Sequence, residues 1–409
     1  MFQNIYIMKN LKIISLIALV LSTATISDNQ LIDAKKISVQ NNLFAFDLYQ
    51  QIAKNNSGNL FFSPFSISTA MAMTYAGATG QTAEEMSKAM HYYSLDDEFH
   101  LSYSSYLKRL ESNAKDNIQL RIANRLWAEK KYKLMPSFVE INAKAYNSPL
   151  QNMDFMHKSE ASRLEINDWV ADKTENRIKD LIPSGAITSD TRLVLTNAIY
   201  FKGDWLYQFK EKDTKEDKFN LADGSTLKAQ FMNFKGALNY YQNATYKMLR
   251  LPYKGVKQSM VIVMPIDQRD MEGVEKVINT AAFDYVFFGG TPEVILSLPK
   301  FKMTLPLNLN RYLSKLGIKS AFTSGADFSK MTPSNDLYIS DVIHKAFIEI
   351  DEKGTEAAAA TAVIMQVESV SDYHKPKPVE FIADHPFLFY IIDDETKAIL
   401  FMGRLMNPS

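Results

Sequence analysis

The sequence predicts an α+β protein with one domain. Apolar residues at helical spacing occupy much of the first half of the chain, whereas the part that follows Gly203 carries the alternating or continuous apolar runs of β-strands. Helices and strands that segregate along a chain in this way are typical of the α+β class. No internal repeat, low-complexity linker or break in composition divides the chain, so we treat 25–409 as a single domain.

The first predicted elements alternate between helices and buried strands. Residues 39–55 place apolar side chains at helical spacing, and a short buried strand, 59–64, follows and ends at a proline. The next helix, 66–77, is apolar on nearly every face, so we expect it to be buried, with Ser63 or Ser66 as its N-cap. The remaining elements of this half are a strand at 118–129, an amphipathic helix at 162–180 and a fully buried strand at 191–201.

β-strands predominate in the second half of the chain. Residues 341–351 alternate between apolar and polar side chains near their end, as a strand does, and Gly354 then interrupts the pattern. The other segments with strand patterns are 227–241, 247–252, 258–265, 293–300 and 379–404.

The composition is that of a packed globular protein, with 46% hydrophobic and 22% charged residues. Lys+Arg and Asp+Glu both number 46, so the chain has no net charge that would attract a nucleic acid, and we expect no such partner. The absence of cysteine excludes disulfides, thiolate metal sites and cysteine nucleophiles.

The N-terminus has the pattern of a secretory signal peptide. Lys9 and Lys12 precede the apolar run 13–21, and Ser22 and Ala24 have the spacing of a cleavage site. We therefore expect 1–24 to be removed and the mature chain to be exported, either to the extracellular space or to a periplasm, without membrane attachment after cleavage. The alternative interpretation of this run is a buried N-terminal helix.

Motifs for catalysis or metal binding are missing from the sequence. There is no Gly-x-Ser-x-Gly elbow, His-Glu-x-x-His pair or phosphate-binding glycine loop. The six histidines are scattered, and no two have the spacing of a metal site. We accordingly expect no cofactor, no metal and no enzymatic activity, although an exported hydrolase of unknown type stays open as an alternative.

The segment 351–371 is the most informative part of the chain. Its alanine tract, 357–362, is broken by Thr361 and is too short to form a helix on its own. In β geometry one face would consist only of small or apolar residues, namely Thr355, Ala357, Ala359, Thr361, Val363, Met365 and Val367. The segment can therefore become a strand within a sheet, whereas the alternative is a short alanine-rich helical turn in the core.

This segment resembles the hinge of the serpins, and similar motifs recur in the expected order over nearly the whole mature chain. They lie at 59–68, 77–86, 123–126, 197–205, 298–301, 344–347, 352–361 and 384–389. The resemblance implies three β-sheets, about nine helices and an exposed reactive loop at about 352–378. It also implies a monomeric suicide-substrate inhibitor of serine proteases, with papain-like cysteine proteases as further targets, whose cleaved loop enters the main sheet and traps the protease in a covalent complex.

The resemblance also assigns roles to individual residues. The hinge, where insertion starts, comprises Glu352, Gly354, Thr355, Glu356, Ala357, Ala358, Ala359, Ala360 and Thr361. The shutter, where strands part, comprises Ser63, Ser66, Asn197 and His344. The breach, where the loop enters, comprises Trp205, Lys300 and Glu352, and an ion pair between Lys300 and Glu352 is expected.

The family's spacing also locates the bond that a protease would cut. Counting 17 residues from Glu352 to Glu368 puts the scissile bond between Glu368 and Ser369, with Met365, Gln366, Val367 and Val370 as alternative cleavage positions. A non-inhibitory serpin that acts as a carrier or chaperone is the alternative within the same family.

Overall fold

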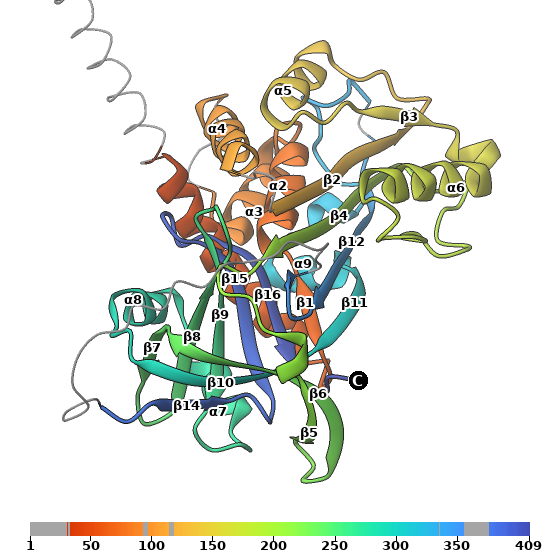
Figure 1. Cartoon of the computed structure of the whole chain (residues 1–409). Helices are drawn as coiled ribbons and strands as arrows, with labels where there is room; N and C mark the ends of the chain where they lie inside the picture. Colours follow the sequence, from red (N-terminus) through yellow and green to blue (C-terminus); the bar gives the residue numbers. More distant parts are fainter. Residues whose placement is uncertain (1–30, 32, 93–96, 114–117, 335, 356–375) are drawn as a thin grey trace, which may run out of the picture.

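The computed structural model describes residues 31, 33–92, 97–113, 118–334, 336–355 and 376–409. Within these residues there are three β-sheets and nine helices, which confirms the predicted α+β class (Figure 1). The helices are 33–53, α2 (Pro64–Tyr75), α3 (Gly80–Met90), α4 (Asp97–Asn113), α5 (Pro136–Tyr146), α6 (Phe155–Lys173), α7 (Met271–Val277), α8 (Thr280–Phe288) and α9 (Asn310–Leu316).

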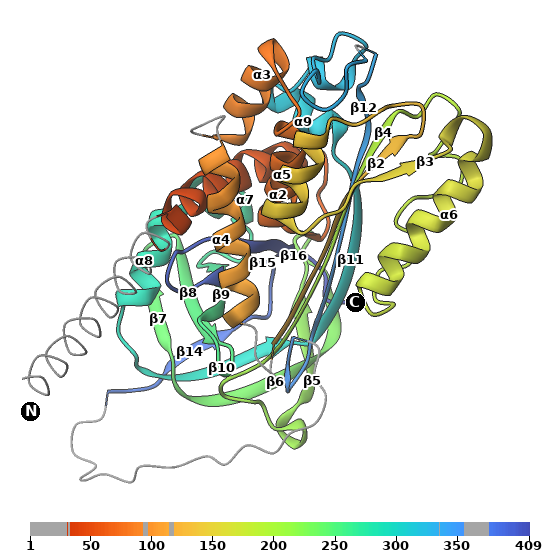
Figure 2. The same cartoon turned by 90° about the horizontal axis from the view of Figure 1, so that it is seen from above.

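The first sheet, which we call the main sheet, contains the long strands of the molecule. Its strand order is β11-β12-β13-β4-β2-β3. The bounds are β11 Phe301–Asn308, β12 Ile339–Ile350, β13 Gly354–Thr355, β4 Leu193–Asp204, β2 Ile118–Glu129 and β3 Gln151–Met153. Figure 2 shows α6 on one face of this sheet and α2, α4 and α5 on the other.

The two other sheets contain most of the strands that the second half of the sequence predicts. The second sheet has the order β1-β16-β15-β9-β8-β7 and the third the order β14-β10-β6-β5. The second sheet consists of β1 Leu60–Phe62, β16 Ile399–Leu405, β15 Phe387–Asp393, β9 Gln258–Pro265, β8 Tyr246–Pro252 and β7 Asn239–Gln242. The third consists of β14 Val379–Ile382, β10 Glu293–Pro299, β6 Thr226–Ala237 and β5 Lys215–Asn220.

Helix α2 follows the chemistry that its sequence predicts. Ser63 is the N-cap, its hydroxyl accepts a hydrogen bond from the Ser66 amide at 3.1 Å, and Pro64 occupies the first turn, where its missing N–H is not needed. All twelve residues of the helix are buried, as expected for a helix that is apolar all round. This helix therefore lies at the centre of the fold and supports the middle of the main sheet.

Helix α6 differs at both ends from the predicted helix 162–180. It begins at Phe155, because the Asp154 carboxylate caps its first turn through the His157 amide at 3.2 Å, and it is kinked at Lys158, whose backbone is not helical. It ends at Lys173, with Thr174 as the C-cap, and Glu175 and Asn176 after it have positive φ angles that no helix continues through.

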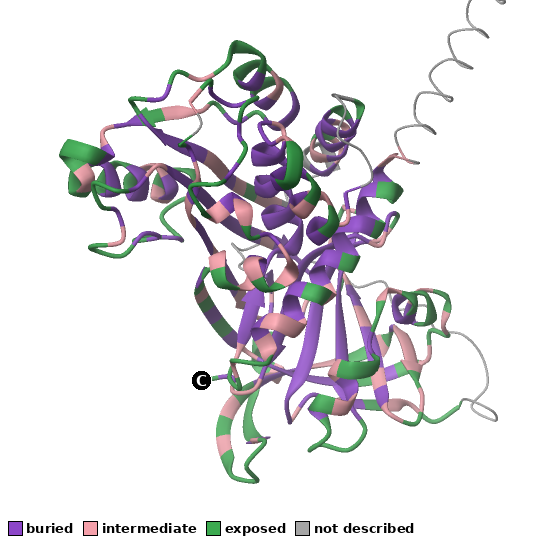
Figure 3. Cartoon of the chain, turned by 180° about the vertical axis from the view of Figure 1, so that it is seen from behind, coloured by how far each residue is buried: buried purple, intermediate pink, exposed green. Residues whose placement is uncertain are grey.

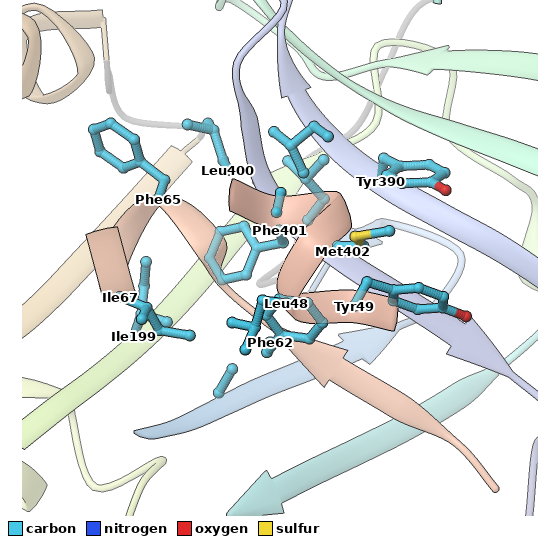
Figure 4. Close-up of a cluster of buried hydrophobic side chains, with 14 of the residues drawn as sticks. Leu48, Tyr49, Phe62, Phe65, Ile67, Ile199, Tyr390, Leu400, Phe401 and Met402 are labelled. Atoms are coloured by element: carbon cyan, nitrogen blue, oxygen red, sulfur yellow. The ribbon is translucent and has the colours of Figure 1, made fainter. Parts of the chain in front are cut away.

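The larger of the two core clusters includes buried residues of the second sheet, of α2 and of the main sheet. Every residue of β9, β15 and β16 is buried, and Figure 3 shows these strands at the centre of the molecule. In Figure 4, Leu48 of the first helix, Phe62 of β1 and Phe401 of β16 belong to this core. In the part of the chain that the structure describes, no helix combines the length and the apolar character needed to cross a bilayer.

Candidate functional site in the main sheet

The main sheet is forked at one end. Strands β4 and β12 pair directly and in parallel as far as the Tyr200–Phe347 pair. Beyond that pair the two-residue strand β13 lies between them and is antiparallel to both, because Thr355 pairs with Gly203 on β4 and with Ile350 on β12. The chain that leaves β12 thus turns back and places the first residues of the predicted hinge in the open end of its own sheet.

A tight turn makes this reversal possible. The Asp351 carboxylate accepts hydrogen bonds from the Lys353 and Gly354 amides at 2.9 and 3.2 Å. Gly354 has no space for a side chain, because a Cβ atom there would lie 2.0 Å from the Gly203 carbonyl oxygen. A glycine is therefore required for the close approach of β13 to β4.

Thr355 is fully buried at the tip of the fork. Its hydroxyl lies 2.7 Å from the Tyr253 hydroxyl, and the Tyr253 ring stacks on Trp205 with ring centroids 4.8 Å apart. The first residue of the hinge beyond Gly354 consequently faces the core and not the solvent.

The three breach residues surround this turn. Lys300 Nζ lies 2.7 Å from Glu352 Oε2, so the expected ion pair is present, and the Thr214 hydroxyl donates to Glu352 Oε1 at 2.7 Å. Burial alone would raise the pKa of the Glu352 carboxyl, but the hydrogen bonds from Lys300 and Thr214 hold this pKa below its usual value. The Trp205 indole donates to the Asp351 carbonyl at 3.0 Å.

The four shutter residues meet halfway along the sheet, and all four are completely buried. Asn197 on β4 and His344 on β12 are direct ladder partners, and their side chains are hydrogen-bonded through His344 Nδ1. His344 Nε2 accepts a hydrogen bond from the Ser63 amide at 3.2 Å, and the Asn197 amide donates to the Ser66 hydroxyl at 2.6 Å. The shutter therefore fastens β4 and β12 to each other and to the N-terminus of α2.

His344 is held in its neutral form. Because Nε2 accepts from a backbone amide, the ring proton is on Nδ1 and points to the Asn197 side-chain oxygen. Burial lowers the pKa of His344 to about 3, despite its hydrogen bond to Asn197.

Two shutter components are absent from the predicted set. Asn124 of β2 is hydrogen-bonded to Asn197 and donates to the Ser66 carbonyl at 3.2 Å, and the Leu400 carbonyl accepts from the Ser63 hydroxyl at 2.6 Å. The motif at 123–126 contains Asn124, and a buried polar residue in an apolar strand is the signal that could have identified it. Leu400 contributes only backbone, which no residue pattern reveals.

The rest of the predicted site lies outside the described residues. This concerns Glu356, Ala357, Ala358, Ala359, Ala360, Thr361, Met365, Gln366, Val367, Glu368, Ser369 and Val370. Among the residues that are described, no group of three or more histidine, cysteine, aspartate or glutamate side chains could hold a metal ion.

Comparisons with known proteins agree with this geometry. The model of the serpin (serine protease inhibitor) family matches residues 39–408. The leukocyte elastase inhibitor of Xenopus tropicalis is 40% identical over 374 residues, which are 89% of this chain and 97% of the relative. The inhibitor of the same name from Homo sapiens is 39% identical over 386 residues, which are 91% and 100% of the two chains.

Solved structures with the same fold include two other proteins of known structure. Serpin48 of the insect Tenebrio molitor superposes with a TM-score of 0.80 at 28% identity, over 91% of this chain and 98% of the other. Human thyroxine-binding globulin superposes with a TM-score of 0.82 at 28% identity, over 92% and 100% of the two chains.

Proposed function

This chain belongs to the serpin family of serine protease inhibitors, and we propose that it acts as an irreversible suicide substrate of serine endopeptidases. A target protease cleaves the reactive loop, and the part of the loop that remains attached to β13 then enters the main sheet between β4 and β12. The acylated protease is carried along as a covalent complex with the monomeric inhibitor. Papain-like cysteine proteases are further targets in this proposal.

The position of β13 is the observation that carries the proposal. Thr355 already pairs with Gly203 and with Ile350. If this antiparallel register continues, each further hinge residue pairs with the preceding residue of each neighbouring strand. The small and apolar face of the tract, which starts with Thr355, then faces the core throughout.

The same register assigns a partner to Thr361. Six residues beyond Thr355, it would lie opposite both Asn197 and His344, whose hydrogen bond must break when β4 and β12 separate. Leaving such buried groups unsatisfied costs about 1–3 kcal/mol each. A threonine hydroxyl can donate and accept, so Thr361 can restore the lost hydrogen bonds at that point.

The energy of insertion is large enough to trap a protease. About ten inserted residues, each with a net gain of roughly 0.5–1.5 kcal/mol per hydrogen bond, contribute on the order of 10 kcal/mol. The whole stability of a folded domain is about 5–15 kcal/mol, so insertion can distort the attached enzyme.

The decisive experiment is incubation with a panel of serine and cysteine proteases, followed by denaturing electrophoresis. We expect a band with the summed mass of the protein and one protease, stable in SDS. If every protease of the panel either ignores the protein or merely cleaves it, the inhibitory function is wrong and a non-inhibitory serpin takes its place.

We propose the bond between Glu368 and Ser369 as the reactive bond. An acidic residue before the cut fits a protease with a basic specificity pocket, through charge pairing. The apolar residues Met365, Val367 and Val370 instead suit elastase-like enzymes, and the relatives named leukocyte elastase inhibitors support that alternative. Mass spectrometry of the released C-terminal peptide identifies the bond, and cleavage only before Gln366 would exclude Glu368.

We also propose that the protein is exported after removal of 1–24, so that 25–409 is the mature serpin domain. The basic and apolar pattern of the N-terminus supports this localisation. The intact mass of protein recovered outside the producing cells should correspond to a chain that starts near Thr25. Full-length protein retained inside the cells would contradict it.

A further inference from the structure

The loops at the end of the main sheet opposite the fork form one continuous surface, which we call the exit surface. It consists of the segments 130–135 after β2, 188–192 before β4 and 336–338 before β12, together with the start of α5. The Tyr132 hydroxyl donates to the Asp336 carbonyl at 3.2 Å. The Tyr338 hydroxyl donates to the Asp190 carbonyl, also at 3.2 Å. Side chains thus hold the three segments together, although each belongs to a different strand.

The register of β13 indicates where an inserted loop would leave the sheet. Thr355 pairs with Gly203. Ten residues further on in the same antiparallel register, Met365 would lie opposite Leu193, the first residue of β4. Glu368 would then lie about 10 Å beyond the end of β4, at roughly 3.3 Å per residue. A protease attached to Glu368 would therefore lie directly against the exit surface.

The exit surface carries an exposed apolar patch at the start of α5. Met135 is 37% exposed and Val139 is 39% exposed, and the two side chains lie one helical turn apart. Pro136 is exposed and Leu134 partly exposed beside them. The Met135 amide donates to the Met331 carbonyl at 2.9 Å, which fastens this patch to the chain that leads into β12. Contiguous apolar side chains on a surface mark a contact site, and methionine adapts its shape to different partners.

A cavity of about 400 Å³ opens beside this patch, between α4, α5 and Lys330. Phe138 and Ile141 of α5 supply apolar wall. The charged side chains of Lys133, Glu140 and Lys330 are exposed around the patch and the cavity. An apolar centre with a polar rim, next to a hollow that can take an anchoring side chain, is the anatomy of a protein–protein interface.

We propose that the exit surface binds the acylated protease after the cleaved loop has been inserted, with Met135 and Val139 as its apolar contacts, and that this contact prolongs the covalent complex. The inference rests on the proposed inhibitory function and adds a partner surface that acts only after cleavage. The partner that fits is a protease with an apolar surface close to its active site, because the short tether through Glu368 allows contact only there.

The contact acts on the step that ends the complex. Water hydrolyses the ester between the Glu368 carbonyl carbon and the serine oxygen of the protease, which frees the serine hydroxyl and leaves a carboxylate on Glu368. This step requires the ordered active site of an intact protease. A protease that is held by the exit surface as well as by its tether has less freedom to regain that geometry, so hydrolysis is slower.

The lifetime of purified complexes with elastase and with a glutamyl endopeptidase tests this proposal on the full chain. We expect Met135→Glu/Val139→Glu to release active protease roughly five-fold faster than the wild type, which corresponds to the loss of one moderate interface contact. The rate of complex formation and the fraction of protease trapped per cleavage should stay unchanged, since both are decided before the protease reaches the exit surface. Lys133→Leu, which adds an apolar side chain next to the patch, should slow the release about two-fold.

Val39→Glu/Leu43→Glu is the matched control, because these two residues are also exposed and one turn apart on a helix, 33–53, that is not part of the exit surface. Its complexes should last as long as those of the wild type. Equal lifetimes for the wild type, Met135→Glu/Val139→Glu and Lys133→Leu would overturn this proposal alone, because complexes would still form. Absence of any complex with the wild type would overturn the proposed function and this inference with it.

Discussion

His344 couples the shutter to pH. Its folded-state pKa is about 3, below the ordinary value of 6.5, so the folded protein resists a proton that the unfolded chain accepts. The neutral imidazole therefore contributes its full stability above pH 6.5, and this contribution is lost as the pH falls from 6.5 toward 3. The loss proceeds at up to about 1.4 kcal/mol per pH unit.

His344→Gln should remove this dependence, because an amide can form hydrogen bonds with Asn197 and with the Ser63 amide but does not titrate. Denaturant unfolding at pH 7, 6 and 5 should show a slope of unfolding free energy against pH that is smaller in the variant by up to about 1.4 kcal/mol per pH unit. Ser63→Ala is the matched control, since it loses the hydroxyl's hydrogen bonds with the Leu400 carbonyl and the Ser66 amide but keeps the imidazole and its partners. Identical slopes in the wild type and in His344→Gln would disprove this role of His344.

Thr355 tests whether loop insertion is needed for inhibition. Thr355→Arg would place a charge in a fully buried position, which costs several kcal/mol, so the hinge should stay out of the sheet. We expect the variant to be cleaved as a substrate, with few or no SDS-stable complexes. Thr355→Val keeps the shape and loses only the hydrogen bond to Tyr253, about 1 kcal/mol, and should still inhibit. Undiminished complex formation by Thr355→Arg would show that insertion is not required.

At the scale of elements, β13 depends on the glycine at its start. Gly354→Ala would put a Cβ atom 2.0 Å from the Gly203 carbonyl oxygen, and this backbone cannot yield as a flexible side chain would. We expect β13 to leave the fork and the fraction of protease trapped per cleaved inhibitor to fall several-fold. Gly325→Ala is the control, because Gly325 is exposed and a Cβ atom there would make only an ordinary contact, 3.6 Å from Thr323 Oγ1, so the trapped fraction should stay unchanged. A normal ratio for Gly354→Ala would mean that β13 is not the start of insertion.

The bounds of an element can be predicted from the sequence where a single apolar periodicity extends over the whole element. Strand β2 has the predicted bounds, Ile118–Glu129, because its alternation matches a sheet with two different faces. Helix α6 is misplaced because its start depends on the Asp154 cap and its end on two residues with positive φ, and neither interrupts the apolar periodicity. Strand β13 cannot be predicted from local pattern at all, since two residues become a strand only in the fork between β4 and β12.

In the candidate site, too, the residues of a local motif could be predicted, whereas contacts between distant segments could not. Ser63, Ser66, Asn197 and His344 are identifiable from family motifs, and the structure brings all four together. Their hydrogen bonds to the Leu400 carbonyl and to Asn124 depend on how three different strands pack, which is information that no single segment contains.

At the scale of the whole molecule, β4 and β12 pair directly with each other, so no long strand lies between them. The hydrogen bonds that an inserted loop would form with both strands are therefore absent from this structure. The two strands pair directly from Ile339 to Phe347 on β12, which corresponds to Leu193 to Tyr200 on β4. An inserting segment can pair with this length of both strands once they separate. A segment of about ten residues at roughly 3.3 Å per residue spans this length. The uncleaved protein is therefore expected to be metastable relative to the cleaved and inserted form.

Cleavage of the reactive loop should consequently stabilise the protein. A gain on the order of 10 kcal/mol, divided by an unfolding entropy of about 2.1 cal/mol/K per residue over about 385 residues, corresponds to a rise in melting temperature on the order of 10 °C. Differential scanning calorimetry before and after cleavage within 363–370, with the cut verified by mass spectrometry, measures it. Cleaved Thr355→Arg should gain much less, because its insertion would bury the new charge. An unchanged melting temperature after cleavage of the wild type would mean that the severed loop does not enter the main sheet, and the proposed trapping mechanism would then lack its source of energy.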